Sequence, residues 1–295
     1  MRILVGTSSG LFTAAGDGLA ALEGREVTAV VSDGSGLWAI ADQHSLWRSD
    51  DGHTWEPATM IEERRLNCAL SLGDSLLIGT SEAHLFLLKG RDVDELSSFE
   101  DAPGRSDWFT PWGGPPDVRS LSRGPTGDVY VNVHVGGILR SKDLDAWKPT
   151  LEIGSDVHQV LATERGVFAA SAWGLGVSRD GGASWSFESD GLHATYARAV
   201  AVCDSTLLMS ASEGPRGRRS AVYRRDSQEA GFVKSGDGLP EWFAHNIDTG
   251  CLDAAGPLAA FATEDGGVFL SEDSGLSWRV LADDLPPARS VLIVA

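Results

Sequence analysis

The sequence predicts an all-β fold, a seven-bladed β-propeller with four-stranded antiparallel blades in a single domain that spans residues 1–295. Three observations predict it. A short turn motif occurs four times, its copies are spaced in multiples of one blade length, and each end of the chain carries part of one further blade. The 35 glycines suit a chain of many short strands and turns.

The repeated motif combines serine, a carboxylate, small residues and a closing tryptophan. Its copies read SDDGHTW, SKDLDAW, SRDGGASW and SEDSGLSW, at residues 49–55, 141–147, 178–185 and 271–278. Each copy follows a short apolar strand. Its aspartate is suited to accept hydrogen bonds from turn amides, and its tryptophan to pack where the next strand begins. We therefore interpret these aspartates as structural rather than catalytic.

The spacing of the motif tryptophans counts the blades. Successive motif tryptophans are 92, 38 and 93 residues apart, so two intervals each hold two periods of about 46 residues, a length typical of one four-stranded blade. Degenerate turns near residues 89–91 and 225–226 fill these two gaps. Residues 2–7 and 10–13 open the chain as a half-unit, and residues 290–294 have the pattern of an innermost strand. The two ends therefore complete a seventh blade and close the ring.

The motif resembles the Asp-box, or BNR repeat (S-x-D-x-G-x-T-W), of the sialidase-like β-propellers. The last two copies match at full length, and the first two are one residue short. The resemblance covers the whole chain as a repeat pattern and is specific for the fold rather than for an activity. It implies that the motif turns occupy one face of the propeller and that a functional site lies on the opposite face.

Charge and composition exclude two classes of partner. A formal net charge of −18 argues against nucleic acid and against anionic membranes, because both bind basic surfaces. The apolar run after Met1 is too short for a signal peptide, and no long apolar stretch follows. The cysteines Cys68, Cys203 and Cys251 are far apart, which favours buried free thiols. We therefore expect a cytoplasmic protein.

The predicted innermost strands share one register, which places one polar residue of each blade at the channel mouth. These residues are Thr28, Asn67, Arg119, His158, Arg198, His245 and Arg289. The three arginines form a cationic spot on an acidic protein, which favours an anionic small-molecule ligand. The alternative is that the ring only hydrates the channel or binds neighbouring carbonyl groups.

Further polar and aromatic residues are predicted on the same face. Asn132 alternates with Tyr130 and His134 on one strand, so all three point to one side. Tyr196 likewise shares a side with Arg198. The predicted ligand-binding residues are Arg119, Arg198, Arg289, Trp173, Trp112 and Asn132.

Three functional hypotheses stay open. In the first, the protein is a hydrolase or lyase acting on an anionic small molecule, with His158, His193 and Tyr196 as its catalytic groups. The sialidase resemblance implies three arginines around a substrate carboxylate, a Tyr–Glu pair as nucleophile and an aspartate as acid/base. The Arg-Ile-Pro motif of sialidases is missing, because the chain begins MRIL. We therefore do not expect true sialidase activity.

In the second hypothesis, histidines from several blades hold a transition metal such as Zn, Fe or Cu, and the protein is a metalloenzyme such as an oxygenase. The arrangement resembles that of carotenoid-cleaving dioxygenases, seven-bladed propellers with four histidines around an iron. The candidate ligands are His134, His158, His193 and His245.

In the third hypothesis, the propeller is a non-enzymatic scaffold that binds a protein partner. Asp-box propellers without catalytic residues occur as assembly factors and as sorting-receptor domains. Residues 92–117, rich in tryptophan, phenylalanine, proline and glycine, would contact the partner. A deep pocket with convergent polar groups would favour chemistry, whereas a rim with exposed aromatic residues would favour a partner.

Overall fold

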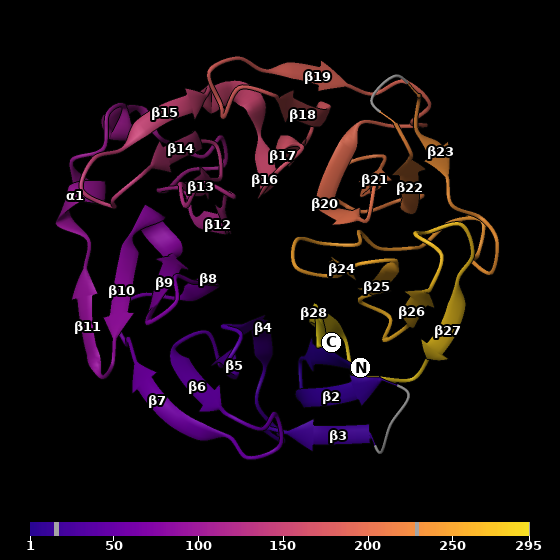
Figure 1. Cartoon of the computed structure of the whole chain (residues 1–295), viewed down its shortest axis with the longest axis horizontal. Coiled ribbons are helices and arrows are strands. Elements are labelled where there is room, and N and C mark those ends of the chain that lie inside the picture. Colours follow the sequence, from indigo (N-terminus) through magenta and orange to yellow (C-terminus); the bar gives the residue numbers. More distant parts are fainter. Residues whose placement is uncertain (15–17, 228–229, 295) are drawn as a thin grey trace.

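The computed structural model describes residues 1–14, 18–227 and 230–294, which form seven four-stranded antiparallel sheets arranged in a ring (Figure 1). The predicted all-β, seven-bladed propeller is confirmed. Within the described ranges, helix is limited to α1 (Ser97–Glu100) and the 3-10 turns η1 (Ser81–Ala83), η2 (Arg105–Asp107) and η3 (Ile153–Ser155). None of the described helices is long and apolar enough to cross a membrane.

The strands of each sheet are numbered along the chain, and the innermost strand of each sheet borders the channel. The first sheet contains β28 (Ala288–Val294), β1 (Arg2–Thr7), β2 (Gly10–Ala14) and β3 (Gly18–Ala21), from the channel outward. The second contains β4 (Val27–Ser32), β5 (Leu37–Ala41), β6 (Ser45–Ser49) and β7 (Glu56–Met60). The third contains β8 (Leu66–Ser71), β9 (Ser75–Thr80), β10 (Leu85–Lys89) and β11 (Asp92–Glu95). The fourth contains β12 (Val118–Arg123), β13 (Val129–Val133), β14 (Gly137–Ser141) and β15 (Lys148–Leu151).

The fifth sheet contains β16 (Val157–Thr163), β17 (Gly166–Ser171), β18 (Gly174–Ser178) and β19 (Ser186–Glu188). The sixth contains β20 (Tyr196–Cys203), β21 (Thr206–Ser212), β22 (Ala221–Arg225) and β23 (Val233–Lys234). The seventh contains β24 (Leu252–Ala255), β25 (Leu258–Ala262), β26 (Val268–Ser271) and β27 (Arg279–Ala282).

The two ends of the chain meet in the first sheet, as predicted. Strand β28 pairs antiparallel with β1, with Arg2 opposite Val294 and Gly6 opposite Ser290, and the two termini lie side by side in Figure 1. Val291 and Ile293 are buried against the seventh sheet. The last strand therefore joins the first and last blades of the ring.

The four motif turns all connect the third and fourth strands of a sheet, and their aspartates have the expected structural role. Asp180 accepts hydrogen bonds from the backbone amide and hydroxyl of Ser184 (2.9 and 2.6 Å) and from the Ser178 hydroxyl (2.8 Å). These bonds, led by that of the Ser184 hydroxyl, lower the pKa of Asp180 to about 2. We call the side of the ring with these turns the motif face.

The opposite side, which we call the mouth face, carries the loops between second and third strands and the connections from one sheet to the next. The degenerate turns are also confirmed, because β10 and β11 flank residues 90–91 and β22 ends at Arg225.

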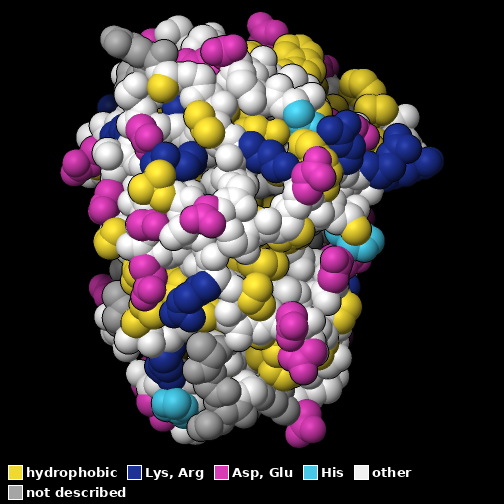
Figure 2. All heavy atoms as spheres, turned by 90° about the vertical axis from the view of Figure 1, so that its right-hand side faces the viewer, with side chains coloured by type: hydrophobic (Ala, Val, Ile, Leu, Met, Phe, Trp, Pro, Cys, Tyr) yellow, Lys and Arg dark blue, Asp and Glu magenta, His cyan; other side chains and the backbone are white. Residues whose placement is uncertain are grey.

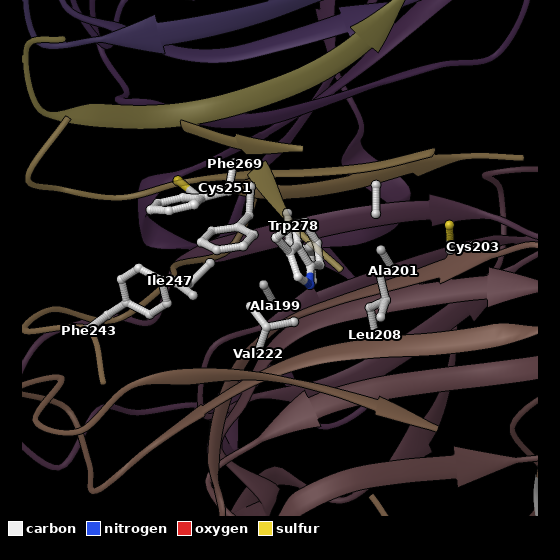
Figure 3. Close-up of a cluster of buried hydrophobic side chains, with 13 residues drawn as sticks. Ala199, Ala201, Cys203, Leu208, Val222, Phe243, Ile247, Cys251, Phe269 and Trp278 are labelled. Atoms are coloured by element: carbon white, nitrogen blue, oxygen red, sulfur yellow. The ribbon is translucent and has the colours of Figure 1, made fainter. Parts of the chain in front are cut away.

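Neighbouring blades are joined by apolar side chains that fill the space between sheets. Figure 3 shows this packing between the sixth and seventh sheets, where Trp278 reaches a cluster that includes Val222 and Leu208. Phe261 stacks on Phe269 with ring centroids 4.7 Å apart, and Trp278 meets Phe261 edge-on at 4.9 Å. A motif tryptophan thus links its turn to the core between two blades.

One predicted strand is wrong. The innermost strand of the seventh sheet is predicted at residues 244–247, but β24 begins at Leu252. Phe243 instead forms an isolated antiparallel bridge with Ser220, the residue before β22 of the sixth sheet. Phe243 and Ile247 are buried in the cluster between the sixth and seventh sheets. The apolar pattern of this segment therefore anchors a crossing loop rather than a strand.

The three cysteines are free thiols. Cys203 and Cys251 are buried as predicted, whereas Cys68 is half-buried. Desolvation raises the pKa of the Cys68 and Cys251 thiols to about 12, so neither forms a reactive thiolate at neutral pH.

Removing residues 290–295 should abolish cooperative folding. The deletion takes away most of β28, which exposes the edge of β1 and uncovers the apolar face of the seventh sheet. Thermal unfolding followed by circular dichroism should show no cooperative transition for the shortened chain. A transition close to that of the intact protein would mean that the ring does not need this closure.

Replacing Trp278 with alanine should lower the free energy of unfolding by about 3–5 kcal/mol, because a buried aromatic side chain leaves a cavity between two blades. Urea unfolding of Trp278→Ala measures the change. Trp112→Ala is the matched control, since Trp112 is 68% exposed, and its effect should stay within about 0.5 kcal/mol.

Candidate functional site

The residues predicted to ring the channel mouth are positioned by backbone irregularities. The pairing of the two innermost strands shifts register at one place in each of six sheets, and each shift lies at a ring residue. These residues are Thr28, Asn67, Arg119, His158, Arg198 and Arg289. A β-bulge redirects the side chain of the extra residue, so one bulge per sheet presents a polar side chain at the mouth.

In the seventh sheet, the ring position belongs to Asp248 rather than to His245. The Ser210 hydroxyl donates to the Ile247 carbonyl (2.8 Å), just as the Asn132 amide of the fourth sheet donates to the Val157 carbonyl (3.0 Å). Residue 248 thus corresponds to residue 158. The orange loop before β24 projects toward the centre of the ring in Figure 1.

Asp248 accepts contacts from two arginines of the ring. Its Oδ2 lies 2.7 Å from Nη1 of Arg198, and its Oδ1 lies 3.5 Å from Nη2 of Arg119. Although burial opposes ionisation, the positive charges of Arg198 and Arg119 hold the pKa of Asp248 below its usual range. The Thr249 hydroxyl donates to the Arg198 carbonyl (3.0 Å) and holds this loop across the mouth.

The three arginines therefore do not form a free cationic cluster. Arg119 and Arg198 share Asp248, and Arg289 lies 2.9 Å from the carboxylate of Glu26 through its Nε. Hydrogen bonds from Arg289 and then Gln43 lower the pKa of Glu26. Each predicted arginine thus has a carboxylate partner already. This pairing leaves the predicted anionic small-molecule ligand without structural support.

Two of the predicted histidines converge, and they do so around an aspartate. Nε2 of His134 lies 3.1 Å from Oδ1 of Asp156, and Nε2 of His158 lies 3.6 Å from the same oxygen. The two imidazole centroids are 5.7 Å apart. The hydrogen bond from His134 is the main reason that the pKa of Asp156 is lowered. Asp156 precedes β16 directly, and His134 follows β13.

His158 is held in one orientation by the neighbouring blade. Its side chain is fully buried, and its Nδ1 lies 2.6 Å from the Ala197 carbonyl oxygen. Because a carbonyl only accepts, Nδ1 carries the proton. Burial, reinforced by the charge of Arg119, lowers the pKa of His158 to about 4, so the imidazole is neutral at pH 7.

Aromatic side chains flank this pair of histidines on both sides. The Tyr196 ring lies 4.7 Å from His158, and the Trp112 ring lies 5.2 Å from His134. The Tyr196 hydroxyl accepts a bond from Arg198 (3.4 Å). Among the described residues, no carboxylate contacts that hydroxyl, so the Tyr–Glu pair implied by the sialidase resemblance is not assembled.

The structure does not bring His193 into this group. Its Nδ1 lies 2.6 Å from the Tyr223 hydroxyl, and its ring lies 4.6 Å from Trp242. Both partners belong to the sixth sheet or to the loop after it. The residues before β20 connect the outermost strand of one sheet to the innermost strand of the next, and His193 lies on the outer part of this path.

His245 also lies apart from His134 and His158. Its side chain is half exposed, with Nδ1 3.5 Å from Glu264 and Nε2 3.4 Å from Asp265. The displaced start of β24 explains this position, because His245 lies three residues before the ring residue Asp248.

Two other predicted ligand-binding residues have different surroundings. Asn132 is completely buried, and its amide bonds the next sheet, so it joins blades rather than facing the mouth. Trp173 is 55% exposed on the loop between β17 and β18 and meets Phe187 edge-on at 5.4 Å.

Two cavities open at the channel. The larger, about 530 Å³, runs along the channel and includes Asn67, Arg119 and Asp248 in its wall. The second, about 440 Å³, lies between the sixth, seventh and first sheets, and its wall includes Arg198, Arg216 and Arg289.

Sequence reasoning missed the two carboxylates that organise the mouth. Asp156 directly precedes the correctly predicted strand that carries His158. Its position next to the ring could therefore have been predicted from the sequence. Asp248 was hidden by the wrong strand at residues 244–247. Only the register of the crossing loop, which depends on contacts with the sixth sheet, reveals it.

Comparisons with known proteins agree on the architecture. No family model matches the chain, and no curated protein matches it. The structure of YCF48 from Cyanidioschyzon merolae is similar, with a TM-score of 0.60 and 16% identity over 88% of this chain and 92% of that one. YCF48 bound to D1 peptide gives 0.59 and 15% identity, over 96% and 85%.

A GH74 enzyme from Niastella koreensis is also similar, with a TM-score of 0.62 and 12% identity over 94% of this chain and 46% of that chain. At these identities the similarity shows the fold alone. The protein is a seven-bladed β-propeller of the kind found in YCF48. The relation to the sialidase-like group stays a prediction.

Asp248→Asn should destabilise the protein by roughly 1–3 kcal/mol at pH 7. The loss of the shared carboxylate leaves two largely buried arginines next to each other, and the cost stays below the ~3–5 kcal/mol of a fully buried pair because Asp248 is 45% exposed. Urea unfolding measures it. Asp50→Asn, which removes an exposed partner of Arg48, should have almost no effect.

The difference between wild type and Asp248→Asn should also depend on pH. Since the folded-state pKa of Asp248 is lowered, its contribution is fully present above the unfolded value of about 3.9 and is lost as the pH falls through the folded value. A difference that grew on acidification would contradict the pairing.

Proposed function

We propose that this propeller is a non-enzymatic scaffold that binds an extended, acidic segment of a partner protein across its mouth face. The observation that carries the proposal is the combination of exposed aromatic residues and basic residues on this one face of an acidic protein. Two further observations support the proposal: a cavity beside the loop between β21 and β22, and a protein of similar fold that binds a peptide.

Three large aromatic side chains are exposed on the mouth face. Phe109 and Trp112, on the loop between β11 and β12, are 59% and 68% exposed, and Trp173 is 55% exposed. Trp112 and Trp173 flank the same cluster, since Trp112 contacts His134, whose partner Asp156 accepts a backbone hydrogen bond from Ala172. Exposed aromatic residues around a cavity are typical of protein-binding surfaces.

Basic side chains lie around the sixth sheet, in the mouth-face loop between β21 and β22 and around Trp242. The loop between β21 and β22 contains Arg216 and Arg218, both exposed and without an ion-pair partner among the described residues. Arg219 and Lys234 lie over the ring of Trp242, at 4.4 and 3.7 Å. Figure 2 shows basic side chains grouped with histidine and hydrophobic side chains at its upper right, with a few acidic ones among them.

The cavity beside this loop fits a carboxylate. Its wall combines Arg198, Arg216 and Arg289 with the acidic Asp248 and Glu264. Arginine binds carboxylates through paired hydrogen bonds, and within the described part of the chain Arg216 has no ion-pair partner that would compete. An acidic segment would place its carboxylates here and its apolar side chains on the neighbouring aromatic residues.

A protein with a similar fold also supports this use of the propeller. YCF48 has been captured with D1 peptide, so a propeller of this shape is able to hold a peptide. The enzymatic hypothesis has less support, because the arginines are paired and the four histidines do not converge.

Selection of a random peptide library displayed on phage against the purified full-length protein tests the proposal. The selected peptides should be enriched in aspartate and glutamate, and their binding should weaken as salt is raised. The double variant Arg216→Glu with Arg218→Glu should lower the affinity for a selected peptide at least about tenfold, and Trp112→Ala by a similar factor.

Matched changes on the motif face serve as controls. Lys142→Glu reverses a charge in a motif turn, and Leu276→Ala removes an exposed apolar side chain (56% exposed). Both should leave the affinity unchanged. Selected peptides without acidic enrichment, or equal losses from the control variants, would overturn the proposal.

A further inference from the structure

The cluster of His134, Asp156 and His158 has the geometry of a metal site. One ligand atom from each residue lies within 4.8 Å of the other two, and two of the separations are 3.1 and 3.6 Å. Ligand atoms about 2.0–2.2 Å from one Zn²⁺ ion are separated by distances of this size. Two imidazole nitrogens and one carboxylate oxygen are a ligand set that zinc and iron sites use. Binding an ion releases the proton that Nε2 of His134 donates to Asp156 in the metal-free protein.

The free nitrogen of His158 points to a cation in this place. Because Nδ1 donates its proton to Ala197, the other nitrogen, Nε2, carries a lone pair. Nε2 is completely buried and has no hydrogen-bond partner among the residues that the structure describes, and it faces the Asp156 carboxylate. A lone pair that faces a carboxylate is repelled unless a cation lies between them, and a buried acceptor without a partner is costly.

We propose that His134, Asp156 and His158 bind one divalent transition-metal ion of the zinc class at the channel mouth. The Ala197 carbonyl acts as the outer partner that fixes the His158 ring and directs Nε2 at the ion. Three protein ligands leave an open coordination position. Arg119 is the nearby positive charge that opposes an ion here, and Asp248 offsets it. Metal binding by this cluster does not require a docked partner protein.

A second group of possible ligands is less suited to a metal. His84 lies between Glu95 and Glu100, with Nδ1 2.6 and 2.9 Å from their carboxylates. Glu100 already pairs with Arg105 at 2.7 Å. The negative charge of Glu100 is therefore already balanced by Arg105. Nδ1 of His84 is also buried without a hydrogen-bond partner among the described residues. It differs from Nε2 of His158 because it can carry its ring proton toward two carboxylates, whereas the proton of His158 is held on Nδ1 by the Ala197 carbonyl.

Isothermal titration calorimetry with ZnCl₂, on full-length protein treated with EDTA and dialysed, tests the proposal. We expect one zinc per chain, and Co²⁺ should give the visible absorption of a site with nitrogen and oxygen ligands. Asp156→Asn should lower zinc affinity at least about 100-fold, since even outer partners of a site change affinity 10- to 100-fold. Asparagine tolerates the positive φ of Asp156 (43°), so this variant should fold.

Two kinds of control identify the site. His193→Ala, His245→Ala and Glu95→Gln should all retain the zinc affinity of the wild type, whereas His158→Ala should lose it. Thermal unfolding of each metal-free variant separates loss of binding from loss of folding. No binding of Zn²⁺ or Co²⁺, affinity that survives Asp156→Asn, or a loss as large in Glu95→Gln would overturn the proposal.

Discussion

The pairing of β28 with β1 is the contact on which the rest of this molecule depends. Each blade buries its two apolar faces only against its neighbours, so a ring with one open joint exposes two faces at once. The closed ring also forces seven innermost strands to begin around one channel. Residues as far apart in sequence as Arg119 and Asp248 thereby form an ion pair, although no short-range interaction in the sequence brings them together.

The sequence was sufficient to predict what depends on short-range chemistry. The motif turns are local, because Asp180 bonds residues at most four positions away, and their spacing counts the blades. The ring positions were also largely predictable from an alignment of strands. The backbone geometry that turns their side chains to the mouth was not predicted, since six of the seven residues lie at β-bulges and the seventh, Asp248, lies in the loop before β24.

The candidate site was harder to predict because its members are set by long-range contacts. Asp248 reaches the mouth only because Ile247 packs between two sheets and Thr249 bonds the backbone of the sixth sheet. The predicted innermost strand of the seventh sheet was placed three residues too early, so His245 was assigned to the ring position that Asp248 occupies. The same error turned a balanced arrangement of charges into an apparently cationic one, which is why the sequence predicted an anionic small-molecule ligand.

The protein has a net charge of −18, yet basic residues determine the electrostatics near the mouth. At physiological ionic strength the Debye length is about 8 Å, so the acidic residues on the outside of the ring are largely screened from a ligand at the mouth. Within that distance Arg216, which is exposed beside a cavity, contributes more to the local electrostatic potential than the net charge of the protein does. The acidic segment proposed above would therefore meet little repulsion from the outer acidic residues and would be held by the nearby arginines and tryptophans. If the proposal holds, the affinity for such a segment depends on contacts made after encounter rather than on long-range electrostatic steering.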